Sequence, residues 1–255
     1  MIASLAMYDW PHQQHHWDRL WDHLRDAIRA RGIDAPDALT RHGSLWDHWQ
    51  SSDLVLGQSC GMPYRTRLHG KVALVGALDH GLPDAPPGWY NSVLVVHRDA
   101  AGHLADFSDR TLAYNGQDSE SGWAAPQAAA ADAGFRFTRS LHTGAHRASL
   151  RAVAERRADI AAIDAETWRL ACRSLPGTTG RLRVIGTTRP TPGLPLIAAR
   201  SHDPDRLAEA VESALAAAEP STLDALHIRG FVRIPAADYL AVPIPAPPSQ
   251  DVPAA

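Results

Sequence analysis

The sequence predicts an α/β protein of two lobes, and two observations carry this prediction. Short apolar, β-rich runs alternate with helical stretches along most of the 255 residues, and such alternation favours parallel sheets covered by helices on both faces. The alternation breaks near Tyr90, starts again with a new set of strands and helices, and returns near Pro195 to the first set. We therefore expect a discontinuous first lobe, an inserted second lobe and a Pro-rich, disordered tail; their ranges are 1–91 with 190–245, 92–189 and 246–255.

The first lobe is expected to alternate short strands with amphipathic helices. Trp17, Leu20, Trp21, Leu24 and Ile28 recur at helical spacing and predict a helix that Gly32 ends. The expected strands are 2–7, 39–41, 53–57, 72–77 and 195–199, and the expected helices are 14–31, 44–50, 204–219 and 222–228.

The second lobe has an alternation of its own. Its expected strands are 92–96, 111–114, 135–141, 159–163 and 182–186. Its expected helices are one that starts close to Trp123 and stops at Gly134, then 147–157 and 165–175.

Composition and charge exclude several classes of function. The formal net charge is -3 and there is no basic run, so we expect no nucleic-acid partner. Cys60 and Cys172 form neither a disulfide framework nor a zinc-like spacing. The histidines follow no His-Glu-x-x-His pattern. We therefore expect neither a metal nor a cofactor.

The start of the sequence bears on localisation. Met1 leads directly into an apolar strand, without the basic segment and cleavage site of a signal peptide. No apolar run approaches the ~20 residues of a membrane span. As written the chain is expected in the cytoplasm, and in the periplasm if its start is truncated.

Three polar turns of the second lobe each follow a strand and precede a helix: 118–122, 141–146 and 163–166. The first amides of a helix have no internal partner and carry partial positive charge, so such turns favour anions. In a parallel sheet the three turns would share one edge. Ser119, Ser121, Thr143 and His146 would then supply donors, and Asp164 an acceptor. In the alternative interpretation Thr143 and Asp164 only cap helices and His146 is a surface residue.

The motifs of these turns resemble a known family. Ser119-x-Ser-Gly122, Thr143-Gly-Ala-His146 and Ala162-Ile-Asp164, with the run 90–96 upstream, are similar to the phosphate/phosphite/phosphonate-binding (PhnD-like) components of ABC importers. The resemblance extends from Ile2 to about Tyr239. It implies a type II periplasmic-binding-protein fold, with two α/β lobes, a hinge near 90–95 and 185–195, and an interlobe cleft.

The resemblance also implies roles for single residues. Ser119, Ser121 and His146 would hold the anionic head group, and Asp164 would take a proton-bearing group. Tyr90 would lie on the cleft wall, and Tyr64 would reach the ligand from the other lobe. Glu120 departs from the family, which has Ser-Thr-Ser here. If Glu120 faces the ligand, repulsion favours a zwitterionic ligand such as an aminoalkyl phosphonate, or a cationic one; if it faces solvent, it only suits the helix dipole.

We expect a non-enzymatic solute-binding protein, monomeric, that captures a small phosphonate- or phosphate-type anion for an ABC importer, with a permease as partner. Two alternatives stay open. One is a cytoplasmic ligand sensor on the same fold. The other is an enzyme similar to the pyrimidine-precursor synthases of thiamine biosynthesis, although those carry a Cys-rich motif and a cofactor-bearing lysine, whereas Lys71 is the single lysine here.

Overall fold

The computed structural model describes residues 1–249 and divides the chain into two compact units. The first unit comprises Met1–Trp89 and Pro192–Ala241. The second unit comprises Tyr90–Thr191 and Val242–Ser249. The chain therefore passes from one unit to the other three times. None of the helices in the described part of the chain is long and apolar enough to cross a membrane.

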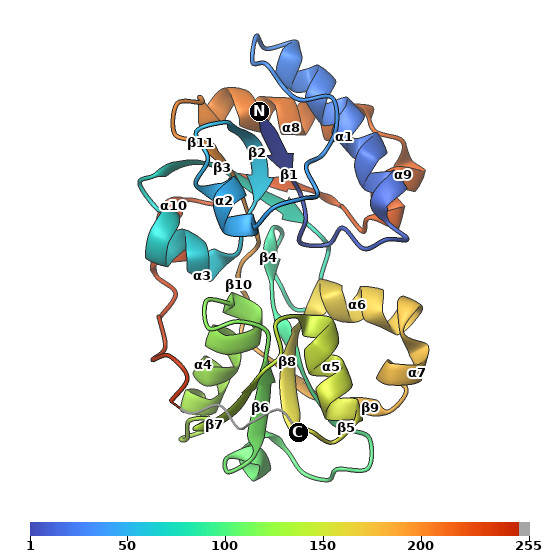
Figure 1. Ribbon diagram of the computed structural model, residues 1–255, viewed down its shortest axis with the longest axis vertical. Helices are drawn as coiled ribbons and strands as arrows, with labels where there is room; N and C mark the ends of the chain where they lie inside the picture. Colours follow the sequence, from blue (N-terminus) through green and yellow to red (C-terminus); the bar gives the residue numbers. More distant parts are fainter. Residues whose placement is uncertain (250–255) are drawn as a thin grey trace. The chain divides into compact units, whose positions relative to one another are not determined.

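The first unit contains a mixed five-stranded sheet (Figure 1). Its outer strand β1 runs parallel to β2, whereas β11 runs antiparallel to both of its neighbours, β2 and β3. β1, β2 and β3 therefore point the same way, and their carboxyl ends share one edge. In sheet order the strands are β1 (Ile2–Ser4), β2 (Leu54–Gln58), β11 (Pro195–Ala199), β3 (Val72–Asp79) and β12 (Gly230–Val232).

Two groups of helices accompany this sheet (Figure 1). The apolar stripe predicted around Trp17 and Trp21 is buried, and its helix packs along α8 and α9. The second group buries Trp49, Tyr64 and Tyr239 against the sheet. The first group is α1 (Gln14–Arg29), α8 (Pro204–Ala217) and α9 (Pro220–Ala225); the second is α2 (Leu45–Trp49), α3 (Gly61–Pro63), the π-helix η1 (Tyr64–Leu68) and α10 (Ala236–Leu240).

The second unit also contains a mixed five-stranded sheet. β6 pairs in parallel with both β7 and β8, whereas β5 runs antiparallel to β8 and β9. The order is β7 (Arg139–His142), β6 (Thr111–Tyr114), β8 (Ile160–Asp164), β5 (Ser92–His97) and β9 (Leu182–Thr187).

Helices α4 and α5 flank β6 and β8 in Figure 1 and pack on the second unit's sheet. Val96, Phe107, Leu112, Trp123 and Phe137 are part of the core beneath them. The helices are η2 (Leu104–Phe107, 3-10), η3 (Glu120–Ala124, π), α4 (Ala125–Asp132), α5 (His146–Ala154), α6 (Ala165–Ser174) and α7 (Pro176–Thr179).

Most predicted elements are present, but two predictions are wrong. The sheets are not wholly parallel, because β5 and β11 enter their sheets directly after the chain passes between units. No crossover helix precedes them there, and parallel pairing needs such a connection. These passages run through β4 (Trp89–Tyr90) and β10 (Thr191–Pro192), which pair with each other. The strand expected at 39–41 is also absent; the amide of Thr40 donates to the carbonyl of Ala3 at 2.7 Å, but no strand forms.

The C-terminal segment 242–249 belongs to the second unit. Trp123 Nε1–H donates to the carbonyl of Ala246 (3.2 Å), and Arg136 donates to that of Pro247 (3.1 Å). The Ser249 hydroxyl donates to the carbonyl of Thr138 (3.2 Å). Of the predicted disordered tail, residues 246–249 therefore make defined contacts, and residues 250–255 lie outside the described residues.

Candidate functional site

Three polar turns gather at one edge of the second unit's sheet. They follow β6, β7 and β8, which run parallel, so the carboxyl ends of these strands share an edge. Each turn opens a helix: η3 after β6, α5 after β7 and α6 after β8. α5 and α6 are labelled in Figure 1. The predicted gathering of the turns is therefore present.

The first turn carries two buried hydroxyls. Ser119 caps η3, with its Oγ accepting a hydrogen bond from the amide of Gly122 at 3.0 Å. Ser121 Oγ lies 3.5 Å from Ser119 Oγ. The hydroxyl of Ser92 in β5 donates to the carbonyl of Ser121 at 3.1 Å, which ties the turn to the sheet. Because Ser119 Oγ accepts from an amide, its own hydrogen remains available to an acceptor.

The second turn places a histidine against the first. Ser121 Oγ and His146 Nε2 lie 2.8 Å apart, and His146 is the first residue of α5. Desolvation lowers the pKa of His146 from 6.5 to about 4, so the ring is neutral at pH 7. Its Nδ1 is buried and has no hydrogen-bond partner among residues 1–249. His146 is thus half-buried and in contact with the first turn, and its contact with a ligand stays a prediction.

Thr143 and Asp164 fit the capping interpretation in part. The Thr143 hydroxyl lies 2.9 Å from the carbonyl of Tyr114, to which it donates, and 2.7 Å from Ser149 Oγ. Asp164 caps α6 by accepting from the amide of Thr167 at 2.9 Å. Both lie at the predicted edge, and their contact with a ligand stays a prediction.

Glu120 lies between Ser119 and Ser121 in the first turn and is only 2% exposed. The interpretation that it faces solvent is therefore wrong. A carboxylate that is removed from water needs compensation, from hydrogen bonds, opposite charge or a proton. The residue that departs from the family pattern is thus part of the buried structure of the turn.

Gly122 permits the close approach of these groups. A Cβ at this position would lie 1.9 Å from Asn115 Oδ1 and 3.3 Å from His146 Cε1. Asn115 Oδ1 is buried without a hydrogen-bond partner in the described chain. The sequence identified Asn115 only as a turn residue, and nothing in the pattern indicates that its side chain is directed at Gly122.

The two predicted tyrosines are both buried. Tyr90 begins the second unit in β4 and is 4% exposed. Tyr64 belongs to the first unit, where its ring packs edge-on against Tyr239, with centroids 5.1 Å apart. Burial raises the pKa of Tyr64. Their predicted contact with a ligand remains a prediction.

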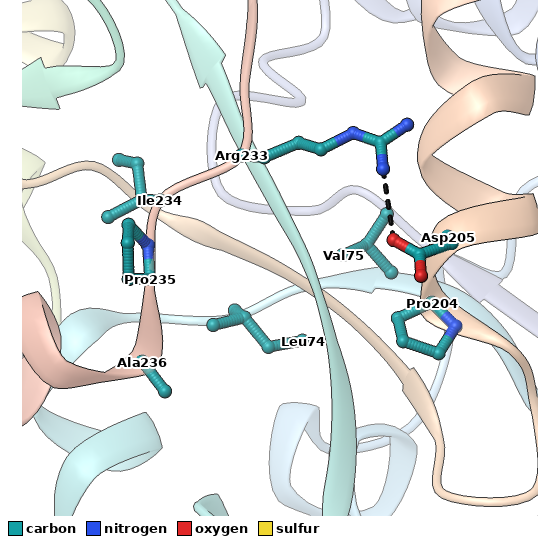
Figure 2. A pocket seen from close by; sticks show the side chains of 8 residues that line it. All are labelled: Leu74, Val75, Pro204, Asp205, Arg233, Ile234, Pro235 and Ala236. Carbon is teal, nitrogen blue, oxygen red and sulfur yellow. Dashed lines mark hydrogen bonds and ion pairs between the residues drawn. The ribbon is translucent and has the colours of Figure 1, made fainter.

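A pocket of about 340 Å³ lies elsewhere, within the first unit. Figure 2 shows Arg233 directed at Asp205, and the two form an ion pair of 2.9 Å. Arg233 also pairs with Glu212 at 3.1 Å, so its charge is already matched. The pocket residues are Leu74, Val75, Pro204, Asp205, Arg233, Ile234, Pro235 and Ala236, none of which is a predicted site residue.

Within the described residues, no group of three or more His, Cys, Asp or Glu side chains is placed to hold a metal ion. The candidate site is the edge of the second unit's sheet at which Ser119, Ser121 and His146 meet, called the serine–histidine edge below.

Comparisons with known proteins bear on the family and the fold of the chain. A family model described as "ABC transporter, phosphonate, periplasmic substrate-binding protein" matches residues 54–239. A search of curated proteins gave no match.

Solved structures resemble more than nine tenths of the chain at low sequence identity. PhnD1 from Prochlorococcus marinus, solved with methylphosphonate, has a TM-score of 0.69 and 14% identity, over 93% of this chain and 94% of that one. XAC2383 from Xanthomonas citri, bound to chloride ion, has a TM-score of 0.67 and 15% identity, over 93% of this chain and 92% of that one. A binding protein component of an ABC phosphonate transporter from Pseudomonas aeruginosa has a TM-score of 0.65 and 17% identity, over 94% of this chain and 82% of that one. These likenesses confirm the predicted type II periplasmic-binding-protein fold.

Proposed function

The chain belongs to the family of periplasmic substrate-binding proteins of phosphonate ABC transporters, and from this premise we propose that its serine–histidine edge binds the phosphonate group of a small solute. The observation that carries the proposal is the 2.8 Å contact between Ser121 Oγ and His146 Nε2 at the start of two helices. It supports a site at which hydroxyls and helix-start amides converge on one anion. Methylphosphonate in the Prochlorococcus protein supports the choice of anion.

The hydrogen bonds of the edge are suited to an anion. In the tautomer that carries its hydrogen on Nε2, His146 donates to Ser121 Oγ, and the Ser121 hydroxyl then donates its own hydrogen to the ligand. Ser119 supplies a second hydroxyl donor, since accepting from the Gly122 amide does not use its hydrogen. Hydrogen bonds to a charged partner contribute about 1.5–3 kcal/mol each. Neutral donors of this kind hold a phosphonate without a matching cation.

Buried Glu120 narrows the class of solute. Two like charges 4 Å apart repel by about 4 kcal/mol at an effective dielectric constant of 20. A plain alkyl phosphonate meets this repulsion if Glu120 is ionised, whereas an aminoalkyl phosphonate brings an ammonium group that offsets it. We therefore propose a zwitterionic, aminoalkyl-type phosphonate as the preferred solute.

We propose that the protein is not an enzyme, although Ser121 and His146 resemble a nucleophile and its base. A base with a pKa of about 4 accepts a proton weakly at neutral pH. A catalytic triad also needs a third group that orients the histidine. His146 Nδ1 has no hydrogen-bond partner in the described part of the chain. Membership of a transport family supports the same conclusion and an ABC permease as partner.

Isothermal titration with methylphosphonate, 2-aminoethylphosphonate, phosphate and phosphite tests the proposal. We expect the tightest binding for 2-aminoethylphosphonate. Circular dichroism before each titration establishes that the protein is folded. A folded protein that binds none of the four compounds removes the phosphonate proposal.

A further inference from the structure

The C-terminal segment 242–249 is buried with a period of three residues. Val242, Pro245 and Pro248 are each half-buried, whereas the other residues of the segment are exposed. The segment forms neither a helix nor a strand. Half of its residues are prolines, namely Pro243, Pro245, Pro247 and Pro248.

The period of three indicates the conformation of the segment. Proline fixes its own φ at about −65° and keeps the residue before it out of the α-helical region. Proline-rich chains of this kind form the polyproline II helix, which has three residues per turn, so residues three apart share one edge. Val242, Pro245 and Pro248 form such an edge. The last two have the Pro-x-x-Pro spacing by which proline-rich segments are recognised.

The second unit holds the segment by its main-chain carbonyls. Trp123 Nε1–H donates to the carbonyl of Ala246 at 3.2 Å, and the Arg136 guanidinium donates to that of Pro247 at 3.1 Å. A polyproline II helix makes no internal hydrogen bonds, so its carbonyls are available to such donors. Trp123 is only 1% exposed, and a buried indole N–H needs an acceptor. The segment supplies that acceptor.

The chemistry of these contacts defines the partner that fits. Both donors bond to the main chain, so they impose no requirement on the side chains at 246 and 247, and the buried edge selects the proline spacing. We propose that Trp123 and Arg136 form a recognition site for a Pro-x-x-Pro segment in the polyproline II conformation, and that the chain's own residues 242–249 occupy this site. Trp123 belongs to η3, the helix that also carries Ser121. The proposal goes beyond phosphonate binding and does not depend on it.

The first test measures hydrogen exchange at Trp123 Nε1 in the full chain by NMR, with Trp123→Phe identifying this signal among those of the 8 tryptophans. Pro245→Ala removes a proline from the buried edge. It should speed exchange about three- to tenfold, because the segment leaves its site more often. Pro247→Ala is the matched control. It also removes one proline and keeps the carbonyl, but Pro247 is exposed, so the rate should stay near that of the wild type. Equal rates in the two variants overturn the proposal.

The second test separates the segment from the site after folding. A protease site inserted between Ala241 and Val242 allows the folded full chain to be cut there, and circular dichroism establishes that the cut protein stays folded. We expect native mass spectrometry to show the segment still bound, and a synthetic peptide of residues 242–249 to displace it. The peptide with Pro245→Ala should compete about three- to tenfold less well than the peptide with Pro247→Ala.

Arg136→Ala in the cut protein should weaken peptide binding about three- to tenfold, because one hydrogen bond to the segment is lost. Arg139→Ala, which alters another exposed arginine nearby in the chain, is the control and should bind as the unsubstituted protein does. A folded cut protein that neither retains the segment nor binds the peptide overturns the proposal. If the cut protein unfolds, the exchange rates at Trp123 alone decide.

Discussion

Ser121 Oγ and His146 Nε2 lie 2.8 Å apart and join the start of η3 to the start of α5. The two residues are 25 positions apart in the sequence. They meet because η3 and α5 follow the parallel neighbours β6 and β7. The contact links the hydroxyls of the first turn to the neutral ring of His146 on the second.

Ser121→Ala should weaken phosphonate binding by about 1–3 kcal/mol, because it removes a hydrogen bond to a charged ligand. Isothermal titration measures the change. Ser201→Ala, which alters an exposed serine of the first unit, is the matched control and should bind as the wild type does. Equal affinities of the two variants would place the phosphonate group elsewhere.

His146 should make stability depend on pH. Its pKa in the folded protein is about 4, below the ordinary 6.5, so the unfolded chain binds this proton more tightly. The contribution of the neutral ring is fully present above pH 6.5 and is lost as the pH falls towards 4. Urea unfolding at several pH values should show a shallower decline across this window in His146→Gln. The same slope in both proteins would contradict a lowered pKa of His146 in the folded state.

Glu120→Gln should alter selectivity more than overall affinity. The variant removes the negative charge, so methylphosphonate should bind more tightly and 2-aminoethylphosphonate more weakly than in the wild type. Each change should reach about 1–4 kcal/mol, the range expected for charges about 4 Å apart near a protein surface. Parallel shifts for both compounds would mean that Glu120 does not discriminate between solutes.

Gly122→Ala should disrupt the site, since the new Cβ would lie 1.9 Å from Asn115 Oδ1. We expect a loss of stability of about 1–3 kcal/mol, typical of overpacking, together with weaker binding. Combining it with Asn115→Ala, which removes the obstructing oxygen, should restore part of both. Gly177→Ala is the control, because a Cβ there meets nothing within 4 Å. The absence of any rescue would assign the effect to another contact.

The sequence predicts the candidate edge well for a physical reason. A polar turn between a strand and a helix is a local feature, and parallel strands bring such turns to one edge wherever their helices pack. β5 and β11, in contrast, run antiparallel to their neighbours, because each follows a segment in which the chain passes from one unit to the other. No local pattern in the sequence indicates this. The π-helix at Glu120 is not predicted either; in it the amides of Ala124 and Ala125 donate to the carbonyls five residues earlier, those of Ser119 and Glu120.

Whether a buried polar side chain has hydrogen-bond partners is even harder to predict from the sequence. Gln58 and Gln127 have the same side chain and are both buried, yet only Gln127 has a backbone amide and carbonyl within reach. Which groups surround a side chain depends on distant segments, so no local pattern distinguishes the two. The burial of Glu120 is a property of the same kind.

The return of the C-terminal segment to the second unit has a practical consequence. β1 begins the chain in the first unit, whereas Ser249 is held on the second by its bond to Thr138. Fluorescent dyes attached at Met1 and at Ile244, which is 59% exposed in the second unit, would therefore label different units without any change to the interior. Energy transfer between them would report optically whether an added solute alters the distance between the labels, and the protein could serve as its own biosensor.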